Sequence, residues 1–229
     1  MTPAVKALVY TNVGVFVFSY FFDPMVSLFG LSPEAVITKG WIWQLFTYLF
    51  LHDTRGFMHI LFNMLSLWMF GVDLERRWGT AAFTKYYFVT GVGAGVATML
   101  VSLLPFASTQ AIYHSYTIGA SGAIYGLLLA WAVLFPYRTI LFMLFFPLPA
   151  RTAAILMGGI AFFSAVSGQN SSVAEATHLS GMVVGWLYLR GPKNLQLQFK
   201  YRMTKWRMDR MRKKFNVHHG GRGKDNWIH

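Results

Sequence analysis

The sequence has no cysteine and few charged residues. Asp, Glu, Lys and Arg make up 12% of the 229 residues, whereas they make up about 25% of a typical soluble domain. The lack of cysteine excludes disulfides, a cysteine nucleophile and thiolate metal sites. Acids are so few and scattered before the C-terminal tail that we expect no metal site and no cofactor. They are Asp23, Glu34, Asp53, Asp73, Glu75 and Glu175.

Hydrophobic residues take the place of the missing charges and make up 55% of the chain. They form six apolar runs, at 4–22, 57–74, 83–104, 117–135, 152–167 and 177–190. About 20 apolar residues cross a bilayer as a helix, so the last two runs are short and need neighbouring residues or a thin bilayer. The first run lacks a good cleavage site and is interpreted as an uncleaved span. We therefore predict an all-α membrane protein whose six-span domain covers residues 1–190.

Positive charge gathers in the tail, residues 191–229. Residues 190–229 hold twelve Lys or Arg against Asp209 and Asp225. Such a tail can bind nucleic acid, but it also suits a cytosolic segment next to anionic lipid headgroups. Aromatic and Met residues between the basic residues favour the membrane surface, and we expect no nucleic-acid partner.

The remaining basic residues orient the spans. If both termini are cytosolic, 18 of the 20 Lys and Arg fall on the cytosolic side, and the outer loops keep only Lys39 and Arg55. Residues 36–52 are rich in Trp, Phe and Tyr, which predicts an element lying in the outer interface. Residues 139–150, with Pro147 and Pro149, are interpreted as a turn at the cytosolic interface.

Four polar residues fall near the outer ends of the even-numbered spans, which all run inward. They are His59, Asn63, Ser121 and His178. A neutral imidazole can take the proton of a serine hydroxyl, and amide, imidazole and first-turn backbone N–H groups can stabilise an oxyanion. The pattern thus suits nucleophilic catalysis in a membrane. Taken alone, the Ser–His pair fits equally a helix-packing serine and a histidine lining an aqueous crevice.

Small residues beside this pair permit close helix approach. Gly122 and Gly126 form one GxxxG sequence, and Gly181 and Gly185 form another. Tyr125 lies one turn after Ser121 and either supports His178 or serves as a core aromatic. Glu175 precedes His178 by three residues but is placed in a loop, so a Ser–His dyad without an acid is the simpler hypothesis.

The motifs together resemble those of rhomboid intramembrane serine proteases of the six-span prokaryotic type. His59-Ile-Leu-Phe-Asn63 is similar to the family's His-x-x-x-Asn, and Gly119-Ala-Ser-Gly122 to its Gly-x-Ser-Gly. His178-Leu-Ser-Gly-Met-Val-Val-Gly185 resembles its last helix, and Gly71-Val-Asp-Leu-Glu75-Arg-Arg-Trp-Gly79 its Gly-x-x-x-Glu-x-x-x-Gly. The resemblance covers about residues 1–190.

The resemblance implies a role for each matching residue. Ser121 is the expected nucleophile and His178 the general base and acid. The expected oxyanion hole consists of His59, Asn63 and the Ser121 N–H, with Tyr125 stacked on the imidazole and Gly119 leaving room beside the nucleophile. Single-span membrane proteins are the implied substrates, cut near the outer face, with the fifth span and residues 168–176 as a mobile gate.

One position departs from the family pattern. Trp43-Gln44 stands where the family often has Trp-Arg, which puts the rigidity of the first outer loop in doubt. The Ser–His pair argues against one rival, a non-catalytic rhomboid-fold binder of membrane proteins. A second rival, a small-solute transporter, predicts a polar site near the middle of the membrane and repeated halves, whereas the polar cluster falls in the outer third and no repeat is found. The expected location is a bacterial inner membrane.

Overall fold

The fold is seen in a computed structural model that describes residues 1–142, 145–166 and 172–191, together with residues 204, 208 and 210. The chain divides into two units, Met1–Leu189 and Arg190–His229. Most of the predicted basic tail lies outside the described residues, and so do residues 168–171 of the predicted gate.

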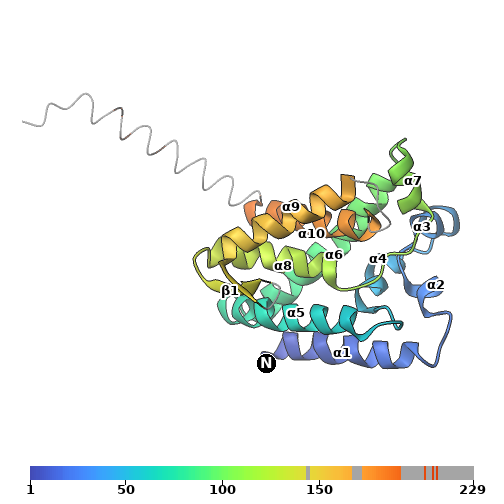
Figure 1. The fold of residues 1–229 in the computed structure, drawn as a ribbon, viewed down its shortest axis with the longest axis horizontal. Helices are drawn as coiled ribbons and strands as arrows, with labels where there is room; N and C mark the ends of the chain where they lie inside the picture. The colour runs from blue at the N-terminus through green and yellow to red at the C-terminus, as the bar shows by residue number, and fades with distance from the viewer. Residues whose placement is uncertain (143–144, 167–171, 192–203, 205–207, 209, 211–229) are drawn as a thin grey trace, which may run out of the picture. The chain divides into compact units, whose positions relative to one another are not determined.

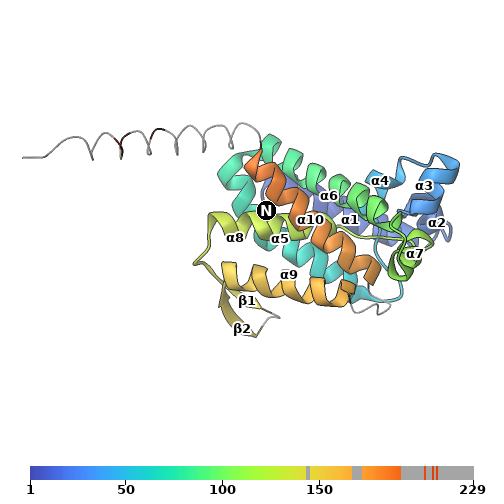
Figure 2. The same cartoon turned by 90° about the horizontal axis from the view of Figure 1, so that it is seen from above.

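Each of the six apolar runs overlaps one helix (Figures 1 and 2). These are α1 (Pro3–Ser19), α5 (Phe57–Trp78), α6 (Thr80–Ser102), α8 (Ser121–Leu134), α9 (Ala150–Val166) and α10 (Ser172–Arg190). By length and composition, α5 is long and apolar enough to cross a membrane, and it alone meets that test among the described residues. Helices α1, α8 and α9 are apolar but shorter, so the number of spans stays a prediction.

Short helices gather at one end of this unit in both views. They are α2 (Met25–Phe29), α3 (Pro33–Lys39), α4 (Gln44–Thr47), the 3-10 turn η1 (Tyr48–Phe50) and α7 (Ala107–Tyr113). Leu31 and Thr117 join two of the connections by reciprocal backbone hydrogen bonds of 2.9 and 2.8 Å. The end of the unit where α8 begins is thus built from chain segments far apart in sequence.

Gln44 braces the connection between α1 and α5, which was predicted to be the first outer loop, contrary to the doubt raised by the missing arginine. Its side chain is buried, and its Oε1 accepts a 3.0 Å hydrogen bond from the backbone N–H of Ser32. Its Nε2 lies 3.3 Å from the backbone oxygens of both Ser27 and Leu28. An amide combines donors and an acceptor, so Gln44 can tie α4 to the chain on both sides of Gly30 without a charge.

The opposite end carries a β-hairpin, which the all-α prediction did not include (Figures 1 and 2). β1 (Thr139–Phe142) pairs antiparallel with β2 (Phe146–Pro149), with Ile140 opposite Leu148. Both strands of a two-stranded sheet are edges, where the missing N–H groups of Pro147 and Pro149 leave a ladder incomplete at little cost. The predicted interfacial turn is therefore a short sheet.

Glu75 joins the end of α5 to the start of α1. Its two carboxylate oxygens accept hydrogen bonds of 2.9 and 3.0 Å from the backbone N–H groups of Ala4 and Val5. Thr80 donates to the same carboxylate at 2.8 Å. A helix N-terminus has unpaired N–H groups and a partial positive charge, so the buried acid is satisfied there.

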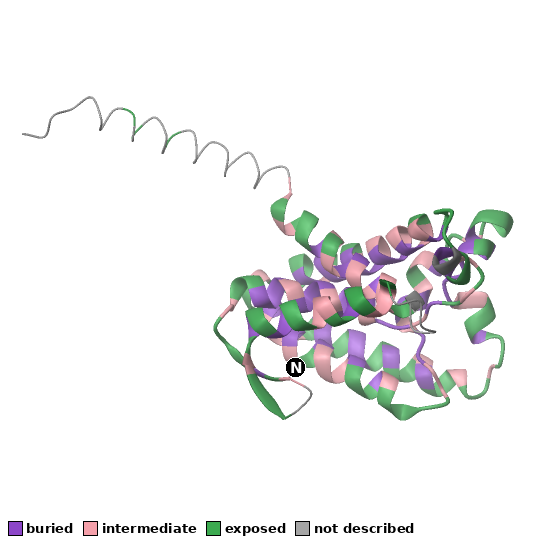
Figure 3. Ribbon diagram, turned by 45° about the horizontal axis from the view of Figure 1, so that its top comes forward, coloured by how far each residue is buried: buried purple, intermediate pink, exposed green. Residues whose placement is uncertain are grey.

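Apolar side chains cover the outside of the unit as well as its core. Figure 3 shows buried positions concentrated along the facing sides of the helices. On α9 the outward side chains remain apolar: Ile155 is 64% exposed, Phe163 73% and Val166 70%. Soluble monomers rarely expose large contiguous apolar patches, so this surface suits lipid contact.

Candidate active site

Ser121 and His178 meet at the junction of α8 and α10. The Oγ of Ser121 lies 2.8 Å from the Nε2 of His178, although 57 residues separate them. Ser121 is the first residue of α8. His178 lies in the second turn of α10 rather than at its start, because that helix begins at Ser172, five residues before the predicted run.

Glycines bring the two helices together. A Cβ built on Gly181 would overlap the carbonyl oxygen of Gly122, and one on Gly185 would lie 3.2 Å from the Cα of Gly126. The two GxxxG sequences thus face each other and leave no room for side chains. Thr177, next to His178, also forms a 2.9 Å hydrogen bond with Thr98 of α6, which ties this part of α10 to a third helix.

Tyr125 stacks on the imidazole of His178. The ring centroids are 4.3 Å apart and the planes differ by 5°. Tyr125 lies one turn after Ser121 on α8, so one face of the helix presents both the hydroxyl and the ring. Of the two interpretations of Tyr125 that the sequence left open, this geometry places its ring against His178.

Gly119 separates His59 from Ser121. A Cβ at Gly119 would lie 3.1 Å from His59 Nε2 and 3.8 Å from Ser121 Oγ, so the predicted residues converge on one small volume. The φ of Gly119 is +116°, a value that side-chain-bearing residues rarely adopt. Its N–H donates a 2.9 Å hydrogen bond to the Tyr48 carbonyl, which holds this loop in place.

His59 has its Nε2 aimed at this volume, and its other nitrogen is already engaged. Nδ1 lies 3.2 Å from the backbone N–H of Asp53 and accepts from it. A neutral imidazole carries one proton, so Nε2 bears the hydrogen and is a donor. Asn63 is buried and uses one Nδ2 hydrogen to bond the His59 carbonyl at 2.7 Å, which leaves the second amide hydrogen for another acceptor.

The short connection before α5 supports His59, a contribution that the sequence did not reveal. Arg55 chelates the Asp53 carboxylate with contacts of 2.9 to 3.3 Å and holds the pKa of that carboxyl below its usual range. The buried ring of His52 lies 5.1 Å from that of His59. Burial lowers the pKa of His52 to about 4, so it packs as a neutral ring at ordinary pH.

The prediction that Glu175 lies in a loop is wrong. This residue lies in the first turn of α10, and its Oε2 is 3.1 Å from His178 Nδ1. Residues three apart on a helix share a face, which explains the contact. The sequence Ser172-Val-Ala-Glu175 has the Ser-x-x-Glu form that often begins helices and could have revealed this start.

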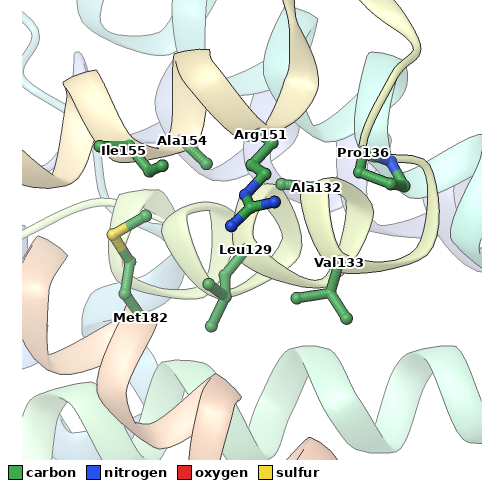
Figure 4. A pocket seen from close by; sticks show the side chains of 8 residues that line it. All are labelled: Leu129, Ala132, Val133, Pro136, Arg151, Ala154, Ile155 and Met182. Carbon is green, nitrogen blue, oxygen red and sulfur yellow. The ribbon is translucent and has the colours of Figure 1, made fainter.

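A separate crevice of about 390 Å³ opens between α8 and α9 (Figure 4). Its lining is apolar except for Arg151, whose guanidinium extends toward α8 in Figure 4. Leu129, Ala132 and Val133 form the α8 wall, and Met182 of α10 closes one side. None of the predicted site residues lines this crevice.

The first unit is a bundle of helices in which Ser121 and His178 are in hydrogen-bonding contact, and the His59 ring lies on the other side of Gly119. A family model described as the rhomboid domain matches residues 39–191. The chain belongs to the rhomboid family and is therefore a membrane protein.

Curated relatives carry rhomboid names. The chain is 30% identical over 158 residues to "Rhomboid protease GluP" of Bacillus subtilis, an alignment that covers 69% of this chain and 27% of that protein. It is 29% identical to "Putative rhomboid protease YdcA" of the same organism, over 66% of this chain and 67% of the relative. "RHOMBOID-like protein 12, mitochondrial" of Arabidopsis thaliana is 28% identical, over 81% and 58%. The chain thus spans about a quarter to two thirds of these relatives.

Proposed function

We propose that this protein is an intramembrane serine endopeptidase that cleaves single-span membrane proteins near the outer face of a bacterial inner membrane. The observation that carries the proposal is the 2.8 Å contact between Ser121 Oγ and His178 Nε2. That distance lets the imidazole take the hydroxyl proton as the serine attacks a peptide carbonyl. Membership of a family of intramembrane serine proteases supports the same reaction.

The reaction has two stages, and water is the co-reactant. Ser121 Oγ bonds to the carbonyl carbon while its proton moves to His178 Nε2; the C–N bond then breaks, and His178 gives that proton to the leaving amine. Water next attacks the acyl ester and gives a proton to His178. The C–O bond to Ser121 breaks, the serine recovers a proton, and a carboxylic acid leaves.

The negative oxygen of both tetrahedral intermediates needs donors. His59 Nε2–H, the spare Asn63 amide hydrogen and the Ser121 backbone N–H are the proposed set, supported by the convergence of His59 and Ser121 around Gly119. N–H groups at a helix start and the helix dipole favour negative charge there. We expect these donors to stabilise the oxyanion. Removing a single such donor can lower kcat by a factor of about 10²–10³.

Topology completes the proposal. Six spans with both termini in the cytosol would put this cluster near the outer face, where a single-span substrate can enter past α9. Small residues beside helix-destabilising sequence are the expected cleavage sites, since an extended segment must reach Ser121. The basic tail is proposed to lie near anionic headgroups.

The test is labelling by a fluorophosphonate probe in detergent, combined with cleavage of a single-span reporter in proteoliposomes. Wild type should be labelled and should cleave, whereas Ser121→Ala and His178→Ala should fall to background in both assays. Ser102→Ala is the matched control, because Ser102 is a buried serine that bonds its own helix and should keep full activity. Undiminished cleavage by Ser121→Ala would overturn the proposal.

A further inference from the structure

Three side chains form a line across the junction of α8 and α10. Glu175 Oε2 lies 3.1 Å from one imidazole nitrogen of His178, and Ser121 Oγ lies 2.8 Å from the other. The Glu175 and His178 side chains are only 19% and 15% exposed. The contact is thus shielded from the solvent that weakens most surface pairs.

This arrangement selects one form of the imidazole. An ionised carboxylate can only accept hydrogen bonds, so its partner Nδ1 must carry the proton. Nε2 is then left with a lone pair that can accept the Ser121 hydroxyl proton. A histidine without such a partner can also adopt the opposite tautomer, which cannot act as the base.

We infer that Glu175 is a positioning residue that acts through His178 and extends the Ser–His pair to a Ser–His–Glu triad. The inference rests on the proposed function and adds an acid that the dyad hypothesis leaves out. In addition to fixing the tautomer, the carboxylate stabilises the imidazolium that forms when His178 takes the serine proton. Tyr125 fixes the plane of the ring by stacking, and Glu175 fixes which nitrogen faces Ser121.

The other described carboxylates with printed partners are engaged elsewhere. Glu75 binds the first turn of α1, Asp53 binds Arg55, and Asp73 binds Arg138 and Trp131. Glu34 pairs with His114 at 3.1 Å. Among these acids, Glu175 is the one whose carboxylate faces His178.

Glu175→Gln tests the inference, because it keeps the size of the side chain and removes the charge. We expect kcat for a single-span reporter in proteoliposomes to fall about 10- to 100-fold with KM changed less than twofold. The general reason is that a serine–histidine pair with the wrong tautomer loses its base, as in the serine-protease triad, where the corresponding loss is about 10⁴-fold in kcat. The smaller figure reflects the partial exposure of Glu175.

The second measurement reports the tautomer directly. In protein labelled with ¹⁵N-histidine, the His178 signals are identified by their loss in His178→Ala. Wild type should show a protonated Nδ1 and an unprotonated Nε2, and Glu175→Gln should move the population toward protonated Nε2. Glu175→Asp, which keeps the charge, should retain more kcat than Glu175→Gln. A residue with a purely structural role would shift thermal stability without changing this balance.

Glu34→Gln is the matched control, since it removes an exposed carboxylate that also contacts a histidine, and it should leave kcat unchanged. Unchanged kcat together with an unchanged His178 tautomer in folded Glu175→Gln would overturn the inference. The proposed function fails in a different way, because wild type itself would then show neither probe labelling nor cleavage.

Discussion

The helix that carries Ser121 meets α10 through glycines and meets α9 across an open crevice. On the α10 side, Gly181 lies so close to Gly122 that a Cβ has no space. On the α9 side, about 390 Å³ remains between Leu129, Ala132 and Ile155. Both neighbours are apolar helices of similar length, 19 residues in α10 and 17 in α9, so hydrophobicity does not explain the difference.

The comparison shows where this fold fixes geometry and where it leaves freedom. A Ser–His hydrogen bond must be held to a fraction of an ångström, because misplacing reacting groups by about 1 Å can cost roughly 10²-fold in rate. Backbone-to-backbone contact at glycines gives that precision. The α9 side has no such glycine contact with α8 and presents Phe163 and Val166 outward, so under the proposed function α9 is the neighbour expected to admit a substrate helix.

Gly181→Ala should have the largest effect, because it removes the close contact that distinguishes α10 from α9. The added Cβ meets the Gly122 carbonyl, so α10 must move away from α8 and lengthen the Ser121–His178 contact. We expect probe labelling and reporter cleavage to fall at least 100-fold, with a lower thermal midpoint. The measurement is the labelling rate of folded protein, checked by size-exclusion chromatography.

Gly159→Ala is the matched control for that change, since no described heavy atom lies within 4 Å of its Cβ position. Alanine is better than glycine in a helix interior by about 0.5–1 kcal/mol, so stability should hold or rise and labelling should be unchanged. Equal losses in the two variants would mean that α9 is fixed as tightly as α10.

Gly119→Ala tests whether the rigid side extends into the loop before Ser121. Alanine at φ +116° is strained by about 1–3 kcal/mol, and its Cβ would lie 3.1 Å from His59 Nε2. We expect kcat for the reporter to fall about 10- to 100-fold, because the loop and His59 must separate. Gly40→Ala is the control, with a positive φ of 68° and open space among the described atoms; a similar kcat loss there would point to general strain instead.

The sequence predicts the helical elements well because lipid imposes long apolar runs. All six predicted runs overlap a helix, and the motif order identified the rhomboid family, which the family match confirms. The boundaries are less exact: α10 begins five residues before the predicted run, and Glu175 was therefore assigned to a loop. Apolarity marks what lies in lipid, but a polar first turn carries no such signal.

Contacts between distant segments are also hard to predict from sequence. Gln44 looks like a weak replacement for arginine until its backbone partners at Ser27, Leu28 and Ser32 are known. Likewise, the segment from Ile140 to Leu148 was predicted to be a turn because of its two prolines, whereas the structure shows a pair of strands there. The roles assigned to Ser121, His178, His59 and Asn63 remain predictions, which the experiments above address.

Gly158→Ala gives the smallest expected effect and refines the comparison between the two neighbours. Gly158 is the point where α9 faces α10, and its added Cβ would lie 3.3 Å from the sulfur and 3.7 Å from the Cε of Met182. Met has three rotatable bonds and adapts to such intrusions, so the contact can relax without moving α10. We expect labelling and kcat to stay within twofold of wild type and KM for the single-span reporter to change by no more than threefold.

A loss like that of Gly181→Ala would show that the position of α9 is transmitted to His178 through Met182. The double variant Gly158→Ala, Met182→Ala separates these cases, because removing the flexible side chain should restore any loss that arises from this contact.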